Sequence, residues 1–349
     1  MKKNVFSYKP LPSLLLPWFS ENARELPWRR DKEPYHVWLS EIMLQQTRVE
    51  AVRDYYLRFL KTFPDITTLA NAEEEAVFKL WEGLGYYSRA RNLLKTAKIV
   101  AEKYEGRFPD SYRDILALPG IGEYTAGAIS SICFEAPAPA VDGNVLRVSA
   151  RISDCHTPIQ LPQYKKEVTD ALKKVYPIGN CGNFTQSLME LGATVCTPRS
   201  PRCGICPLSD ICLGKKHGTA ESLPVKMPKK ERTQYEKTVF ILHCQGKFAV
   251  RKRAESGLLA GLWEFPNVPG RLHPDKAVRR AEAWGVFPEA PTRSLDRVHI
   301  FTHAEWHMVC YIIPCKNAPE DFHWVTPDEM NDVIALPTAF RIFWDAYSD

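Results

Sequence analysis

The chain has 349 residues, of which 45% are hydrophobic and 25% charged, a composition typical of a globular protein with about two domains. It contains no apolar run near the roughly 18 residues of a membrane-spanning helix, and Pro12 and Pro17 interrupt the apolar stretch Leu14–Leu16. We therefore expect a cytoplasmic protein that does not enter a membrane. In that compartment, ten cysteines favour free thiols and a metal site over a disulfide framework.

The net charge of +5 is unevenly distributed, with +5 on residues 1–217, +2 on residues 218–234 and −2 on residues 235–349. If the partner is a nucleic acid, the first segment supplies most of the electrostatic attraction. An excess of this size is also ordinary for a protein surface, so charge alone does not identify the partner.

The first 195 residues are predicted to be all-helical. The longest pattern runs from Pro34 to Phe63 as one helix, with apolar side chains at alternating spacings of four and three and Gln45 as the one polar member of that face. Shorter helical patterns follow at Glu73–Leu84, Ser88–Tyr104, Tyr112–Ala117, Tyr124–Phe134, Asn144–Ile152, Tyr164–Val175 and Asn183–Ala193.

Residues 218–234 are interpreted as an exposed linker, because Gly218, Pro224 and Pro228 stand among lysines and arginines with little apolar content. Beyond the linker the hydrophobic period changes to two, which predicts a smaller α+β domain at 235–349. Its expected strands are Thr238–Cys244, Lys247–Arg253, Val298–Ile300 and Trp306–Ile313, with a turn at Gln245-Gly246 and a helix at Asp275–Trp284.

Four cysteines, Cys196, Cys203, Cys206 and Cys212, lie within 17 residues at the spacing C-x6-C-x2-C-x5-C. Four thiolates on one loop can bind either a [4Fe–4S] cluster or a tetrahedral zinc ion, and the spacing leaves both open. The other six cysteines are scattered, and we interpret them as small buried side chains.

A glycine-rich turn and two acidic residues are further candidates. In Leu118-Pro119-Gly120-Ile121-Gly122, two glycines between helical patterns can turn the backbone so that its N–H groups meet a phosphate, although plain turns share this pattern. Glu41 lies beside the apolar face of its helix, where burial would keep it protonated. Asp142 precedes a helix, where it can also serve as an N-cap.

Taken in order, five blocks resemble the helix-hairpin-helix glycosylase superfamily that includes endonuclease III, and in particular its MutY branch. The resemblance covers nearly the whole chain and favours a [4Fe–4S] cluster bound by the four cysteines. The blocks are Ser40-Glu41-Ile42-Met43-Leu44-Gln45-Gln46-Thr47, Gly83-Leu84-Gly85-Tyr86-Tyr87, Leu118-Pro119-Gly120-Ile121-Gly122, Val141-Asp142-Gly143-Asn144-Val145 and the cysteine loop.

The resemblance implies a base-excision repair enzyme that flips adenine out of DNA and hydrolyses its N-glycosidic bond, where adenine is mispaired with 8-oxoguanine or guanine. It implies that Glu41 protonates adenine and that Asp142 stabilises the sugar cation, with Tyr124 and Asn144 orienting them. Lyases of the superfamily carry a lysine nucleophile where this chain has Tyr124, so we expect a monofunctional glycosylase.

The same resemblance implies residues for binding. The base pocket would contain Arg24, Trp28, Arg29, Gln186 and Glu190, and the DNA contacts would come from Leu44, Gln46, Thr47, Tyr86, Gly120 and Gly122. For Trp28, a plain core aromatic is an equal alternative.

Leu258–Pro266 resembles a Nudix-type domain, but Val278–Gly285 lacks the carboxylates of the Nudix metal site. We therefore expect a reader of 8-oxoguanine without hydrolase activity, in which Phe301, Thr302 and His303 form the recognition loop.

The predicted protein is thus multi-domain, with an all-α helix-hairpin-helix glycosylase domain and iron–sulfur cluster loop at 1–217, a linker at 218–234 and an α+β Nudix-like domain at 235–349. We expect a nucleoid-associated monomer whose partner is double-stranded DNA. An endonuclease III-like glycosylase with lyase activity, or a non-catalytic damage-binding protein, are the alternatives. Tyr124 argues against the first, and the pair Glu41 and Asp142 argues against the second.

Overall fold

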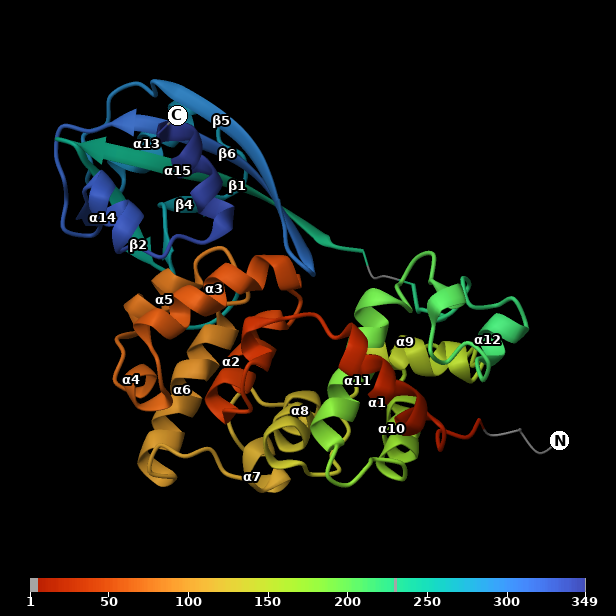
Figure 1. Ribbon diagram of the computed structural model, residues 1–349. Coiled ribbons are helices and arrows are strands. Elements are labelled where there is room, and N and C mark those ends of the chain that lie inside the picture. The colour runs from red at the N-terminus through yellow and green to blue at the C-terminus, as the bar shows by residue number, and fades with distance from the viewer. Residues whose placement is uncertain (1–5, 229–230, 349) are drawn as a thin grey trace. The chain divides into compact units, whose positions relative to one another are not determined.

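A computed structural model describes residues 6–228 and 231–348 (Figure 1). These residues divide into two compact units. The first unit comprises residues up to 71 together with 92–228, and the second comprises residues 72–91 together with the chain after the linker. The linker positions 229–230 lie outside the described residues.

The described part of the first unit consists of helices and loops, which confirms the helical prediction for the first 195 residues. Helix α6 begins in the second unit and continues into the first. The elements are α1 (Leu11–Asn22), η1 (Pro27–Arg29), α2 (Pro34–Leu44), α3 (Val49–Thr62), α4 (Ile66–Ala70), α6 (Ser88–Lys103), α7 (Tyr112–Leu116), α8 (Glu123–Phe134), α9 (Gly143–Ile152), α10 (Pro162–Lys173), α11 (Cys181–Thr194), η2 (Cys203–Ile205) and α12 (Leu213–Lys216).

The prediction of one helix from Pro34 to Phe63 is wrong, because the chain breaks between α2 and α3. Gln46 in the break has a φ of 61°, in the left-handed region, and a residue in that conformation cannot continue a right-handed helix. The apolar pattern runs across the break because both helices bury their apolar side chains, among them Trp38 on α2 and Val52 on α3.

Helix α11 is central to the packing of the first unit. Its side chains Phe184 and Leu188 are buried in one cluster with Leu11 and Leu15 of α1 and with Val145 of α9. Burial of aliphatic and aromatic side chains of this kind stabilises a fold by about 1.5–3 kcal/mol each. The packing fixes α9 and α11 as the walls on which the candidate site is built.

The second unit contains a seven-stranded mixed sheet in the order β3-β2-β1-β6-β5, with β4 also paired to β1 and β7 to β2. Strands β1 and β6 are parallel over their full length. The strands are β1 (Thr233–Cys244), β2 (Lys247–Lys252), β3 (Trp263–Glu264), β4 (Asn267–Pro269), β5 (Arg293–Ile300), β6 (Ala304–Pro314) and β7 (His323–Val325), and the helices are α5 (Glu74–Trp81), α13 (Pro274–Glu282), α14 (Pro327–Asp332) and α15 (Thr338–Ser348).

Alternating side chains of β1 separate two cores on the two faces of this sheet. Val239 and Ile241 pack with Phe343 of α15, whereas Phe240 and Leu242 pack with the helix α13. The α+β prediction is therefore confirmed, although β1 begins at Thr233, earlier than expected. In the described residues, no helix combines the length and the apolar content needed to span a bilayer.

Candidate active site and cysteine loop

A cavity of about 200 Å³ lies in the first unit, between α2, α8, α9 and α11. A dry cavity of about 150 Å³ can hold a benzene ring, so this one has room for a flat ring system. It brings together every predicted catalytic and base-pocket residue and two of the predicted DNA contacts. These residues are Glu41, Asp142, Tyr124, Asn144, Arg24, Trp28, Arg29, Gln186, Glu190, Leu44 and Thr47.

Glu41 is a buried carboxyl group on α2 that faces this cavity. The hydroxyl of Tyr124 donates a hydrogen bond of 2.6 Å to its Oε2 atom. Burial raises the pKa of Glu41 to about 7, against the opposing effect of the Tyr124 hydrogen bond, and the nearby Asp142 charge raises it further. Glu41 can therefore hold a proton near neutral pH and give it up to a bound group.

Asp142 is the N-cap of α9, as the simplest interpretation of its position predicted. Its carboxylate accepts hydrogen bonds of 2.7 Å from the backbone N–H of Val145 and from Nδ2 of Asn144. Burial raises the pKa of Asp142, and these hydrogen bonds oppose the rise. The N-cap role does not remove Asp142 from the cavity, so one side chain both begins the helix and faces the pocket.

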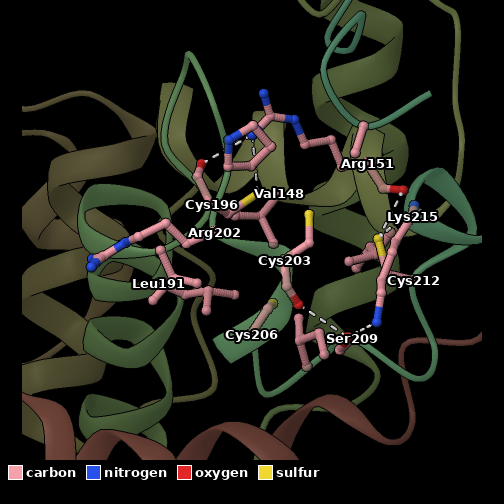
Figure 2. Close-up of a pocket in the computed structure, with 15 residues that line it drawn as sticks. Val148, Arg151, Leu191, Cys196, Arg202, Cys203, Cys206, Ser209, Cys212 and Lys215 are labelled. Atoms are coloured by element: carbon pink, nitrogen blue, oxygen red, sulfur yellow. Dashed lines mark hydrogen bonds between the residues drawn. The ribbon is translucent and has the colours of Figure 1, made fainter. Parts of the chain in front are cut away.

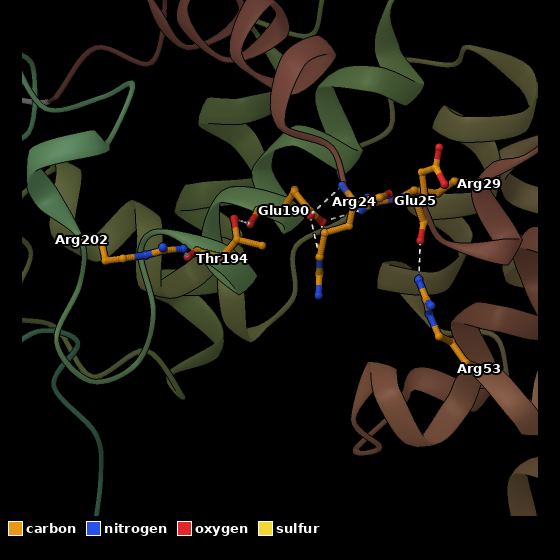
Figure 3. A network of polar contacts seen from close by, with 7 residues as sticks. All are labelled: Arg24, Glu25, Arg29, Arg53, Glu190, Thr194 and Arg202. Atoms are coloured by element: carbon orange, nitrogen blue, oxygen red, sulfur yellow. Dashed lines mark hydrogen bonds and ion pairs between the residues drawn. The ribbon is translucent and has the colours of Figure 1, made fainter.

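Glu190 of α11 forms the other charged wall of the pocket (Figure 3). Its fully buried carboxylate accepts hydrogen bonds from Nε and Nη2 of Arg24 at 2.6 and 3.1 Å, and from Nη2 of Arg29 at 2.8 Å. Burial acts to raise the pKa of Glu190, but the hydrogen bonds from Arg24 and the charge of Arg29 hold it below its ordinary value. This carboxyl group is therefore a fixed anion.

Trp28 satisfies both of the interpretations considered for it. Its ring is buried and packs edge-on against Tyr56 with a centroid distance of 5.4 Å, as a core aromatic does. It also lines the cavity, so it gives the pocket an apolar wall.

The four cysteines of the loop line one small cavity in the structure (Figure 2). Cys196 follows α11, Cys203 begins η2, Cys206 directly follows it, and Cys212 is the N-cap of α12. The rest of the lining is largely apolar, including Leu208. A ring of four soft thiol ligands around an apolar space is the donor set that an iron–sulfur cluster needs.

Arg151 fixes this loop from the buried face of α9. Its guanidinium donates to the backbone oxygens of Cys196, Thr197, Pro198 and Leu223 over 2.7–3.2 Å, and lies 3.3 Å from the Cys196 sulfur. A guanidinium beside a sulfur stabilises a thiolate ligand.

One turn earlier, Arg147 links the loop to the catalytic pocket. It donates to the oxygen of Cys196 at 2.9 Å and to Oδ1 of Asn144 at 2.9 Å, and Asn144 in turn donates to Asp142. Sequence reasoning missed both arginines. Their signal was a pair of arginines four positions apart on the buried face of a helix, where a charge needs a specific set of acceptors.

The predicted DNA contacts that do not line the pocket are mostly exposed. Gly120 lies in the turn between α7 and α8 with a φ of 73°, and a Cβ there would stand 2.6 Å from the Cβ of Asn92. This position therefore requires glycine. Gly122 is the N-cap of α8, and both glycines and Gln46 are exposed.

In the second unit, the hydroxyls of Tyr86 and Thr302 are hydrogen-bonded to each other. Phe301 packs against His299 and Trp306 with ring centroids 4.5 and 4.8 Å apart. Thr302 and His303 are exposed. The structure thus joins two predicted recognition segments that lie far apart in the sequence.

Comparison with known families assigns each part of the chain. Residues 39–177 match the HhH-GPD superfamily of base excision DNA repair proteins, residues 196–212 match the iron-sulfur binding domain of endonuclease III, and residues 238–346 match the NUDIX domain.

Full-length relatives agree with that assignment. The chain is 33% identical over 306 residues to the adenine DNA glycosylase of Buchnera aphidicola, which covers 86% of this chain and 85% of the relative. It is 34% identical over 401 aligned residues to the adenine DNA glycosylase of Mus musculus. This alignment covers 97% of this chain and 78% of the relative. A trapped covalent intermediate of endonuclease III with DNA superposes with a TM-score of 0.51 at 25% identity, over 60% of this chain and 94% of that one.

Proposed function

Because this chain belongs to the adenine DNA glycosylase family, we propose that Glu41 and Asp142 divide the chemistry of adenine removal between them. The chain is a base-excision repair hydrolase that acts on the N-glycosyl bond of adenine in DNA, and its cofactor is a [4Fe–4S] cluster. The proposal concerns the residues that perform each step.

Adenine leaves deoxyribose poorly unless its ring carries an extra proton, and the sugar departs through a cation-like state. Glu41, with its pKa near 7, gives its proton to N7 of the flipped adenine while the C1′–N9 bond breaks and its electron pair moves to the base. The Asp142 carboxylate stabilises the cation, and the hydrogen bonds from Val145 and Asn144 keep that carboxylate in place. Water then attacks C1′ and gives its proton to the Glu41 carboxylate, which restores the acid.

Tyr124 and Asn144 are positioning residues in this scheme, since each holds one of the two carboxyl groups by a hydrogen bond. Arg24, Trp28, Arg29, Gln186 and Glu190 form the deeper wall against the flipped base. The observation that carries the proposal is that Glu41, whose pKa is raised to about 7, and Asp142, whose carboxyl group accepts two hydrogen bonds, line a single pocket.

Cys196, Cys203, Cys206 and Cys212 would hold the cluster, which supplies four iron–sulfur bonds that crosslink the loop when bound. Arg199 and Arg202 on the same loop present cations suited to DNA phosphates. The exposed glycines Gly120 and Gly122 offer their main-chain N–H groups to the DNA phosphates as well.

We propose that the base opposite adenine is 8-oxoguanine, read by the second unit. Thr302 and Tyr86 present hydroxyls from one hydrogen-bonded pair, and the N7–H of 8-oxoguanine is a donor that guanine lacks. Leu44, Gln46 and Thr47 contact the DNA duplex at the gap that the flipped adenine leaves.

Along the chain we propose a glycosylase domain at 1–217, a linker at 218–234 and a recognition domain at 235–349. The protein acts as a monomer on nucleoid DNA.

Single-turnover cleavage of an A:8-oxoguanine duplex tests the catalytic assignment. Glu41→Gln and Asp142→Asn keep the shape of each side chain and remove its chemistry, so each is expected to lose adenine release by about 10³-fold or more while duplex binding persists. Glu123→Gln, at an exposed position on α8 outside the pocket, is the matched control. Near wild-type rates in either of the first two variants would refute the assignment.

A further inference from the structure

A second, larger cavity of about 540 Å³ adjoins the base pocket in the first unit. It is formed by the segment 23–30, by Arg53 of α3 and by Asn183 of α11, and we call it the rear cavity. The two cavities share Arg24, Leu26, Arg29 and Gln186, so these four side chains are a common wall.

On the side formed by Asn183, the rear cavity extends away from Asp142. The last turn of α11 packs against α9, since a Cβ on Gly192 would stand 2.6 Å from the Cβ of Asn144. Asn183 lies nine residues earlier on the same helix, which at 1.5 Å per residue is about 13 Å away. Gln186, between them, faces both cavities.

The rear cavity also reaches solvent. Ala23, Arg30, Arg53 and Asn183 are exposed residues that line it. Of the two arginines in the common wall, Arg24 has 34% of its side chain exposed and Arg29 has 15%. Arg24 is therefore the wall residue with room to turn outward, while Glu190 keeps its bond to Arg29.

The lining of the rear cavity suits a planar purine ring. Guanidinium groups are planar, stack on base rings and donate hydrogen bonds to ring nitrogens. Arg24 and Arg29 share the carboxylate of Glu190, and Arg53 donates to the backbone oxygen of Glu25, so these three guanidinium groups are held in place before a ligand enters (Figure 3). Phe19, under the guanidinium of Arg29 at 5.5 Å, adds an apolar surface.

We propose that the rear cavity binds the free adenine product and is its route out of the enzyme. This inference rests on the proposed function, in which the sugar of the flipped nucleotide stays at Asp142. After the bond breaks, the abasic sugar still lies at Asp142, so the base can leave early only past the wall that the two cavities share. Adenine then passes Arg24 and Gln186 into the rear cavity while the enzyme remains on the DNA.

Asn183→Trp tests the proposal by filling the rear cavity from an exposed position, and Gln163→Trp, at an exposed position of α10 away from both cavities, is the matched control. The full-length enzyme cleaves a duplex with radiolabelled adenine opposite 8-oxoguanine. Abasic sites are measured after the reaction is quenched. Free adenine is measured in the filtrate of a membrane that retains protein–DNA complexes. In the wild type, adenine is expected in the filtrate at the rate of cleavage while the DNA is still retained.

For Asn183→Trp, we expect abasic sites to form within twofold of the wild-type rate and adenine release to slow at least fivefold, with Gln163→Trp unchanged. Ala23→Phe, on another wall of the rear cavity, should repeat the result. Adenine that leaves the wild type only together with DNA, or that leaves Asn183→Trp and Ala23→Phe as fast as it is cut, overturns the exit route. If the wild type forms no abasic sites at all, it is the proposed function that fails.

Binding of labelled adenine to the enzyme on abasic product DNA gives a second, independent measurement. Equilibrium dialysis should show at least fivefold weaker binding for Asn183→Trp than for the wild type, with no competition by inorganic phosphate. Competition by phosphate would show a site for anions and would overturn the assignment to a purine.

Discussion

The base pocket is lined by two buried glutamates whose pKa values are shifted in opposite directions. Glu41 has a tyrosine hydroxyl as its hydrogen-bond partner, and its pKa is raised to about 7. Glu190 is more deeply buried, yet Arg24 and Arg29 hold its pKa below the ordinary value. Burial alone therefore does not set the charge of a glutamate, because the partners that fold against it decide the sign of the shift.

The difference separates a chemical role from a structural one. A neutral acid held by one neutral donor can release its proton, whereas a carboxylate held by two guanidiniums cannot take one up without breaking both ion pairs. The pocket therefore holds one carboxyl group that can react and one whose charge is fixed.

The largest effect on stability should come from Glu190→Gln. Removing the charge leaves Arg24 and Arg29 without their shared anion, and loss of one partner of a buried pair costs about 3 kcal/mol. Urea denaturation near neutral pH should show this loss, while the same substitution at Glu41 should not lower the free energy of unfolding, because burial already makes the charged form of Glu41 unfavourable. Equal losses at both positions would erase the distinction between the two glutamates.

The pH dependence of adenine excision should report the protonation of Glu41. Glu41 is protonated below about pH 7, so the single-turnover rate should fall about tenfold per pH unit well above that value. Because the folded pKa lies above the unfolded one, ionisation of Glu41 also removes stability as the pH rises from about 4.5 to 7. The lowered pKa of Glu190 acts in the reverse direction and costs stability as the pH falls. A rate that rises with pH through 7 would contradict the acid role of Glu41.

Tyr124→Phe should have a smaller effect, which is a shift of the same pH–rate profile. The hydrogen bond from Tyr124 lowers the pKa of Glu41, so its removal should move the alkaline limb of the rate profile to higher pH. Rates measured at matched ionic strength across pH 6–9 would show the shift. A limb that stays in place would mean that another group sets it.

The smallest expected effect lies outside the pocket, at Thr302. Thr302→Ala removes one hydroxyl from the pair with Tyr86, at a cost of about 1 kcal/mol, or roughly fivefold, in the preference for A:8-oxoguanine over A:G. Cleavage of both duplexes by the folded variant measures that ratio. The pH profile of Glu41 should not move, and an unchanged ratio would remove Thr302 from recognition.

The sequence by itself determined the local features of this protein. Periods of 3.6 and 2 separated the helical and the mixed parts, because side-chain direction follows the backbone repeat. The cysteine spacing and the two hairpin glycines predicted their loop and turn, since each needs particular residues close together in the chain. The family resemblance carried by the ordered blocks also named the residues that the structure gathers in one pocket.

Only the tertiary structure decided what depends on distant partners. The apolar pattern from Pro34 to Phe63 is continuous in the sequence, yet the chain breaks at Gln46, where Leu44 and Thr47 turn into the pocket. Residues 72–91 join the second unit although the helical pattern around them belongs to the first. Glu41 and Glu190 look alike in the sequence, because a pKa depends on the groups that folding brings near, and Arg24 lies 166 positions from Glu190.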